Sequence, residues 1–119
     1  MLKKRMAEDE IIHIVKNCAR VLVEKKANDV LVMDLRKINS YLDYFVVSTG
    51  NSHIHCTALA KEIQRYFHSI EVPGIAKPRL DTGWIALDYS AIVVHIFTKE
   101  LREYYQLERL WGDADFLTF

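Results

Sequence analysis

Apolar residues recur at helical spacing in three stretches of the chain. Over residues 8–26 they fall on one face of a helix, with polar side chains opposite: Ile11, Ile12, Val15, Cys18, Ala19 and Leu22. Residues 52–70 repeat this pattern and begin with Ser52, a residue type that caps helix N-termini. Residues 98–111 form a third amphipathic stretch that ends at Gly112. The pattern predicts three helices, the first over about residues 8–26.

Four short stretches of β-branched and aromatic residues lie between these helices. Residues 30–35 and 45–48 precede the second helix, and residues 84–88 and 92–97 follow it. Strands separated by a helix favour parallel pairing, whereas the three-residue connection after residue 88 favours an antiparallel hairpin. We therefore predict an α/β fold, a single-domain sandwich over residues 1–119 with a mixed sheet of about four or five strands covered by helices. The tail, about residues 113–119, carries apolar side chains that can dock back onto this domain.

The size and composition exclude several classes of protein. The 119 residues are 27% charged, and no apolar run approaches the ~18 residues needed to cross a bilayer. The basic start, with Lys3, Lys4 and Arg5, continues into acidic residues and is not a secretory signal. Only two cysteines are present, Cys18 and Cys56, and both fall within apolar helix faces as core residues. A reducing, cytoplasmic location is expected.

The net charge of zero hides a gradient along the chain. Residues 1–40 carry nine basic and six acidic side chains, residues 41–80 four and three, and residues 81–119 three and seven. Proteins that bind nucleic acid through the phosphate backbone usually carry an excess of basic side chains, and this chain has no such excess. The acidic final third instead favours a basic protein partner.

The residues that could carry catalysis or bind metal do not form a recognised pattern. His53 and His55 are two positions apart at the start of a helix, so their side chains diverge and cannot share a metal as residues at i and i+4 do. The loop Gly50–Ser52 lacks the further glycines and the lysine of phosphate-binding loops. The alternative interpretation is a minimal nucleotidyltransferase that uses this loop with Asp34 or Asp88. We predict no catalytic residues, metal or cofactor.

The final third contains the side chains that best fit a protein interface. His95 alternates with apolar residues on a strand with two apolar faces, and Asp88 is a conceivable hydrogen-bond partner for it. On one continuous helix, Glu108 lies in the middle of an arc of aromatic and leucine side chains. It then needs a Tyr hydroxyl, a Trp N–H or an outside partner. Tyr and Trp beside carboxylates are typical of interaction hot spots, although core packing explains each aromatic singly as well.

Several separated motifs resemble the ribosomal silencing factor S family, also called the Iojap-like family. The resemblance covers about residues 10–113 and is carried by DYFVVSTGNS at 43–52 with His55 and Ala58, WIALDY at 84–89, VVHIF at 93–97, and Arg102 with YYQLERLW at 104–111. Two segments depart from the family pattern. Ser90-Ala91 replaces the usual Gly-Asp, and Lys77-Pro78-Arg79-Leu80 replaces a stretch that usually contains Glu-Gly.

The resemblance implies a translation repressor that is not an enzyme. It implies binding to the large ribosomal subunit through the fourteenth large-subunit protein, which keeps the small subunit from joining, and a homodimer when free. It also implies a topology related to the nucleotidyltransferases without their catalytic acids. By matching positions, the partner contacts are expected at Trp84, Asp88, Arg102, Tyr105, Glu108 and Trp111, with His95 in support.

Overall fold

The computed structural model describes residues 7–119, so the basic stretch of Lys3, Lys4 and Arg5 lies outside it. Its elements follow the order α1 (Glu8–Glu24), β1 (Asn28–Asp34), β2 (Tyr44–Gly50), α2 (His53–Ser69), β3 (Trp84–Asp88), β4 (Ile92–Thr98), α3 (Lys99–Tyr105), α4 (Leu107–Leu110) and β5 (Asp115–Leu117). Within residues 7–119, no helix has the length and apolar content needed to cross a membrane.

The sheet is mixed and has five strands, in the order β3-β4-β2-β1-β5. β2 and β4 are parallel because the crossover through α2 connects β2 to the hairpin β3–β4, and the other neighbouring strands are antiparallel. The tail docks as β5 against β1, with Met33 opposite Phe116. These findings confirm the predicted α/β fold and the predicted hairpin.

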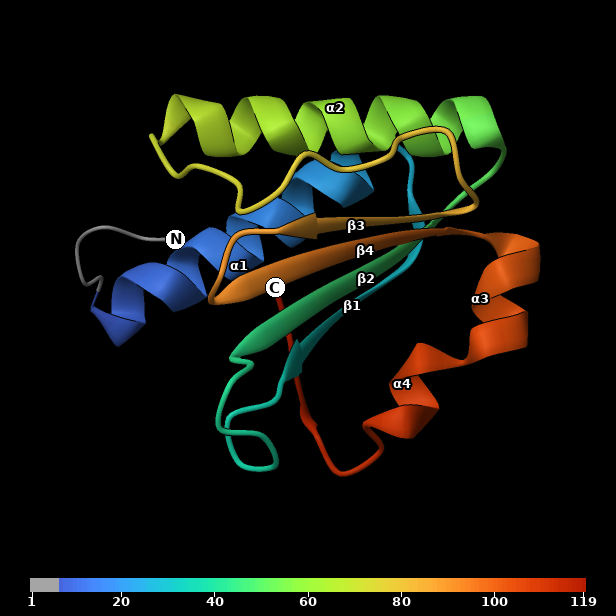
Figure 1. The fold of residues 1–119 in the computed structure, drawn as a ribbon. Coiled ribbons are helices and arrows are strands. Elements are labelled where there is room, and N and C mark those ends of the chain that lie inside the picture. The colour runs from blue at the N-terminus through green and yellow to red at the C-terminus, as the bar shows by residue number, and fades with distance from the viewer. Residues whose placement is uncertain (1–6) are drawn as a thin grey trace.

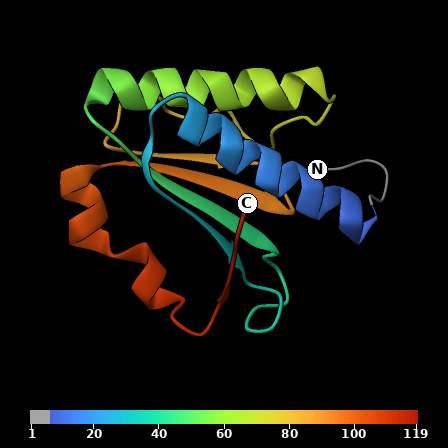
Figure 2. The ribbon, with the colours of Figure 1, turned by 180° about the vertical axis from the view of Figure 1, so that it is seen from behind.

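Helices α1 and α2 cover one face of the sheet and bury the main core (Figures 1 and 2). Their apolar faces are those expected, with Cys18 and Cys56 fully buried among aliphatic residues. Burial raises the pKa of both thiols, which keeps them protonated and unreactive. The α2 N-terminus forms where Ser52 Oγ accepts a hydrogen bond from the His55 backbone N–H, at 3.1 Å.

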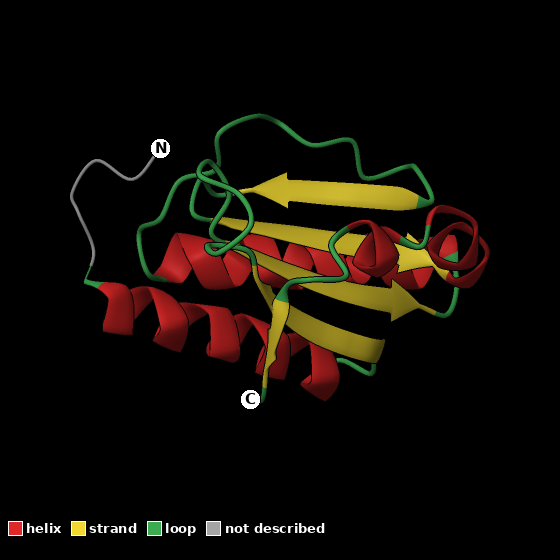
Figure 3. Cartoon of the chain, turned by 90° about the horizontal axis from the view of Figure 1, so that it is seen from below, coloured by secondary structure: helices red, strands yellow, loops and turns green. Residues whose placement is uncertain are grey.

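On the opposite face of the sheet, α3 and α4 lie toward one end (Figure 3), and the loop before β2 packs Leu42 against the same face. A smaller apolar cluster lies under them, with Met33, Phe45, Phe97 and Leu107 among its buried members. Toward the other end, the same face of β3 carries the exposed side chains of Ala86 and Asp88. This partly open face determines where large side chains remain accessible.

The prediction of one continuous helix over residues 98–111 is wrong at Gln106. This residue adopts a left-handed conformation, with φ 47° and ψ 52°, and separates α3 from α4. Thr98 caps α3 by accepting a hydrogen bond from the Leu101 backbone N–H. The break turns α4 relative to α3, so positions on the two helices no longer share one helical wheel.

β3 forms one edge of the sheet, and its outward backbone is partly occupied. The Trp84 carbonyl accepts a hydrogen bond from the Thr82 hydroxyl at 2.8 Å, and the Asp88 carbonyl accepts one from the Ile75 N–H at 2.9 Å. The loop that connects α2 to β3 therefore shields both ends of this strand.

Candidate partner-binding surface

A continuous row of aromatic rings crosses the partly open face of the sheet. Trp111 meets Phe45 edge-on, Phe45 meets His95, His95 meets Trp84, and Trp84 packs against Tyr105, with ring centroids 6.0, 4.4, 5.9 and 4.9 Å apart in that order. We call the row formed by Trp84, Tyr105 and Trp111 over Phe45 and His95 the aromatic face. Its rings come from β2, β3, β4, α3 and the end of α4, so only the folded domain assembles it.

The outer members of the aromatic face are accessible, whereas its floor is buried. Tyr105 is 45% exposed, and Trp84 and Trp111 are half-buried. The neighbouring Tyr104 is 77% exposed and lies edge-on to Tyr105 with ring centroids 5.0 Å apart. Large aromatic side chains that are held by packing on one side and open on the other lose little conformational entropy on binding, which suits a hot spot.

The Trp84 indole is fixed by a hydrogen bond to His95. Trp84 Nε1–H donates to His95 Nδ1 at 3.0 Å, so the imidazole proton resides on Nε2. Burial lowers the pKa of His95 from 6.5 to about 4, which keeps the ring neutral and able to accept this bond. The hydrogen-bond partner of His95 is therefore Trp84 and not the predicted Asp88. The Asp88 carboxylate accepts from the Ser90 backbone N–H instead.

Arg102 is an internal bond donor rather than an exposed contact. It is only 8% exposed, and its Nη1 donates to the Asp29 carbonyl at 2.6 Å and to the Thr49 hydroxyl at 2.9 Å. Its Nε donates to Glu108 Oε2 at 3.2 Å. These bonds connect α3, α4 and the ends of β1 and β2, so Arg102 positions the helices that carry part of the aromatic face.

The expected position of Glu108 among the aromatic rings is also corrected. That expectation assumed a continuous helix, whereas the break at Gln106 turns Glu108 toward Arg102. Its partner is therefore a guanidinium rather than a Tyr hydroxyl or a Trp N–H. Among the residues expected at the interface, Trp84, Tyr105 and Trp111 are brought together. Asp88 lies exposed at the far end of β3.

The geometry separates the residues that the nucleotidyltransferase alternative requires. Asp34 lies opposite Tyr44 and Asp88 lies opposite Val93, so both carboxylates are at the ends where β2 and β4 begin. Gly50 is six residues further along β2, about 20 Å away at the usual rise per residue. Asp34 moreover pairs with Arg36, at 2.7 Å. The loop and the two carboxylates do not form one site, and residues 7–119 contain no cluster of three potential metal ligands.

Sequence reasoning missed Phe45 as part of this surface. The residue sits in a run of β-branched and aromatic positions, all of which the strand buries. Strand alternation and the parallel register together would have found it, because Phe45 pairs with Val93 and Val47 pairs with His95 on the same face. The register itself cannot be read from one strand alone.

Comparisons with known proteins agree with this fold. The family described as "Ribosomal silencing factor during starvation" matches residues 8–118. The ribosomal silencing factor of Bacillus subtilis is 36% identical over 105 residues, which cover 85% of this chain and 86% of that protein. A crystal structure of a Chromobacterium violaceum protein, 28% identical, superposes with a TM-score of 0.80 over 90% of this chain and 88% of that one.

A more distant relative in mouse is named "Mitochondrial assembly of ribosomal large subunit protein 1". It is 26% identical over 95 residues, which cover 76% of this chain and 42% of the mouse protein. The family match spans nearly every described residue, and the first relative exceeds 30% identity over most of both chains. The chain belongs to the ribosomal silencing factor family.

Proposed function

We propose that the chain represses translation by binding the large ribosomal subunit through its fourteenth protein and by blocking the small subunit from joining. The aromatic face, exposed on the side of the sheet that α3 and α4 leave open, is the observation that carries this proposal. The family name supports a ribosomal role, and the name of the mouse relative supports the large subunit as the partner. The proposal implies a regulator that is not an enzyme and that acts in the cytoplasm.

The acidic excess of residues 81–119 supports a partner with a basic surface. Residues 81–119 carry seven acidic and three basic side chains, and one of the three, Arg102, is buried and bonded internally. Asp88 and Glu103 remain exposed on β3 and α3. Complementary charge would speed and orient docking, while the aromatic rings would supply most of the affinity.

The inhibition we propose is steric. The described residues extend over 36 × 32 × 24 Å, so a bound copy would exclude the small subunit from a region of this size on the surface to which it binds. No reaction is required for this effect, and the block would last as long as the complex does.

Co-sedimentation with purified large subunits tests the proposed interface. Tyr105→Ala removes an exposed ring with little loss of core packing. Trp84→Phe keeps an aromatic ring at this position but removes the indole N–H and part of the indole's contact area. We expect each variant to bind at least about tenfold more weakly, in the range of a moderate hot spot. Ile54→Ala is the matched control, because Ile54 is 84% exposed on α2, which covers the other face of the sheet.

Light scattering during subunit joining tests the consequence. Wild type and Ile54→Ala should reduce joining at saturating concentration, and Tyr105→Ala should do so only at higher concentration. Large subunits depleted of the fourteenth protein should lose wild-type binding. Equal binding by Tyr105→Ala, Trp84→Phe and wild type, or undisturbed joining in the presence of wild type, would refute the proposal.

We also propose that the free chain forms a homodimer, as the resemblance implies. Sedimentation equilibrium of wild type and Tyr105→Ala would measure the association and reveal whether the aromatic face takes part. A wild-type chain that stays monomeric at 100-fold the concentration used for ribosome binding would contradict this part of the proposal.

A further inference from the structure

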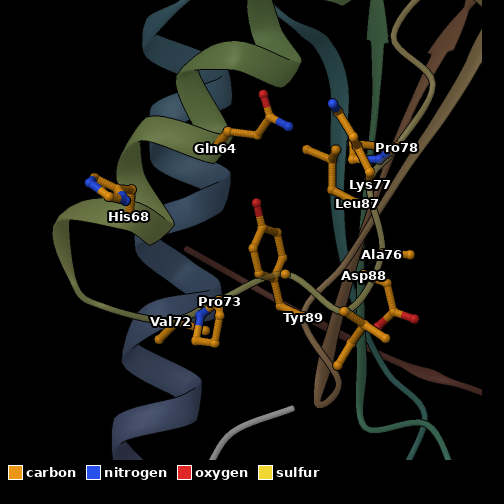
Figure 4. A pocket seen from close by; sticks show the side chains of 12 residues that line it. Gln64, His68, Val72, Pro73, Ala76, Lys77, Pro78, Leu87, Asp88 and Tyr89 are labelled. Carbon is orange, nitrogen blue, oxygen red and sulfur yellow. The ribbon is translucent and has the colours of Figure 1, made fainter.

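A concave site lies away from the aromatic face, between α2 and the loop that follows it. The cleft has a volume of about 410 Å³, within the range of small-molecule sites. Gln64 and His68 of α2 line one wall, Lys77 and Pro78 of the loop line the other, and Leu87 and Tyr89 form the floor. Figure 4 shows these side chains around the opening.

The walls of this cleft are held by internal contacts. The Val72 N–H donates to the Phe67 carbonyl at 3.0 Å, which turns the chain at the end of α2. The Ile75 N–H donates to the Asp88 carbonyl at 2.9 Å, which fixes the loop to β3. The Tyr89 ring stacks on Phe67 with centroids 3.7 Å apart. The site is therefore formed before any ligand binds.

Tyr89 directs an unused hydrogen-bond donor into the cleft. The residue is only 6% exposed, and its hydroxyl is in none of the side-chain hydrogen bonds found among residues 7–119. The hydroxyl oxygen is not one of the fully buried unpartnered atoms, so it is open to the cleft. In Figure 4 the hydroxyl points toward α2, in the space between Gln64 and the loop. Burial raises the pKa of Tyr89 to about 12, so the hydroxyl remains a donor at neutral pH.

The other polar groups at the opening add positive charge and further donors. The Lys77 ammonium forms no ion pair within the described residues, and Figure 4 places Lys77 and Gln64 on the two sides of the opening. The one acidic side chain in the lining, Asp88, turns its carboxylate away from Tyr89 and accepts from the Ser90 N–H. The remaining wall is apolar, with Val72, Pro73 and Pro78.

We propose that this cleft binds a small organic anion, a carboxylate or a phosphate monoester, whose charged group meets Tyr89 Oη and Lys77 Nζ and whose apolar part lies against Pro78 and Leu87. The cleft shares no lining residue with the aromatic face, so anion binding here does not depend on ribosome binding.

Titration of the ¹⁵N-labelled full chain followed by NMR tests the proposal. Phenyl phosphate and benzoate share one apolar ring but differ in their anionic group, and benzamide is the neutral counterpart. We expect saturable shifts at Gly74, Ile75 and the Gln64 side-chain amide with at least one of the two anions. Benzamide should bind about tenfold more weakly than that anion, because it lacks the charge that strengthens a hydrogen bond.

Substitutions identify the groups that bind. Tyr89→Phe keeps the stack on Phe67 and removes only the hydroxyl, and it should weaken anion binding about tenfold. Lys77→Gln should weaken it about threefold because the ammonium is exposed, and Lys61→Gln, on α2 outside the cleft, should have no effect. If Tyr89→Phe does not fold, Lys77→Gln decides the outcome.

Tighter binding of phenyl phosphate or benzoate than of benzamide supports the proposal. The anion that binds more tightly shows whether the cleft prefers a phosphate or a carboxylate. The proposal is overturned if neither anion gives saturable shifts in the cleft up to 20 mM. It is also overturned if benzamide binds as tightly as the anions, or if the variants of Tyr89 and Lys77 bind like wild type. None of these outcomes bears on the aromatic face, so failure here is distinguishable from failure of the proposed function.

Discussion

Replacing Arg102 by leucine tests whether this side chain holds the two short helices on the sheet. Leucine fills part of the space but removes three hydrogen bonds, those to the Asp29 carbonyl, the Thr49 hydroxyl and the Glu108 carboxylate. Both of the first two bonds have a charged donor; the bond to Thr49 is buried and the bond to Asp29 is partly buried. Such a bond contributes about 1.5 kcal/mol.

The bond to Glu108 adds less, because the Glu108 side chain is 28% exposed and water can solvate its carboxylate. We therefore expect Arg102→Leu to lower the free energy of unfolding by about 3 kcal/mol. For a chain of this length, that loss lowers Tm by roughly 12 °C.

Urea unfolding followed by tryptophan fluorescence measures this loss, since the chain has two tryptophans and both lie on the aromatic face. Arg109→Leu is the matched control. Arg109 is exposed, and within residues 7–119 its side chain bonds only to Gln106, so its replacement should change stability by less than about 0.5 kcal/mol. A loss below about 1 kcal/mol for Arg102→Leu would refute the assigned role.

Three further predictions concern single positions. The pKa of His95 is about 4 in the folded chain and 6.5 in the unfolded chain, so the free energy of unfolding should fall by up to about 3 kcal/mol as pH drops from 6.5 to 4. Urea unfolding at both pH values should find this loss in wild type and not in His95→Asn. Gly50→Ala should destabilise by about 2 kcal/mol by thermal unfolding, because a Cβ would lie 2.6 Å from Cys56 Sγ; an unchanged Tm would contradict this. Ser90→Gly should stabilise by about 0.5 kcal/mol, because Ser90 has φ 72°; a lower urea midpoint would contradict this.

Sequence periodicity predicted the elements whose stability depends on one buried face. The face of α1, the start of α2 at Ser52 and the bounds of β3 agree with the pattern, because each depends on local spacing and capping. The same reasoning could not predict β5, whose three residues pair with β1 about eighty positions earlier in the chain. Such a short pairing leaves almost no local signal.

The break at Gln106 also lacks a local signal. Residues 99–110 contain good helix formers and neither Gly nor Pro, so propensity favours one helix. In an unbroken helix, however, residues six positions apart face different directions, and Arg102 could not reach Glu108. The break therefore accompanies tertiary bonds that no helical wheel represents.

The hydrogen-bond partner of His95 could not be predicted either, because it depends on which side chains of the neighbouring strand come within reach. His95 lies opposite Ala86, so Trp84 and Asp88 are both diagonal neighbours on one face. Alternation predicted the face but could not choose between them. The long indole reaches the imidazole, whereas the short Asp88 side chain bonds within its own turn.

The shielding of β3 has a consequence for how the chain behaves at high concentration. A bare sheet edge is a template on which other chains can add strands and begin to aggregate. Here two outward carbonyls of β3 are occupied by Thr82 and Ile75, and the opposite edge, β5, is only three residues long. The protein can therefore expose aromatic side chains to a partner while leaving few unpaired strand backbone groups on which other chains could add and form fibrils.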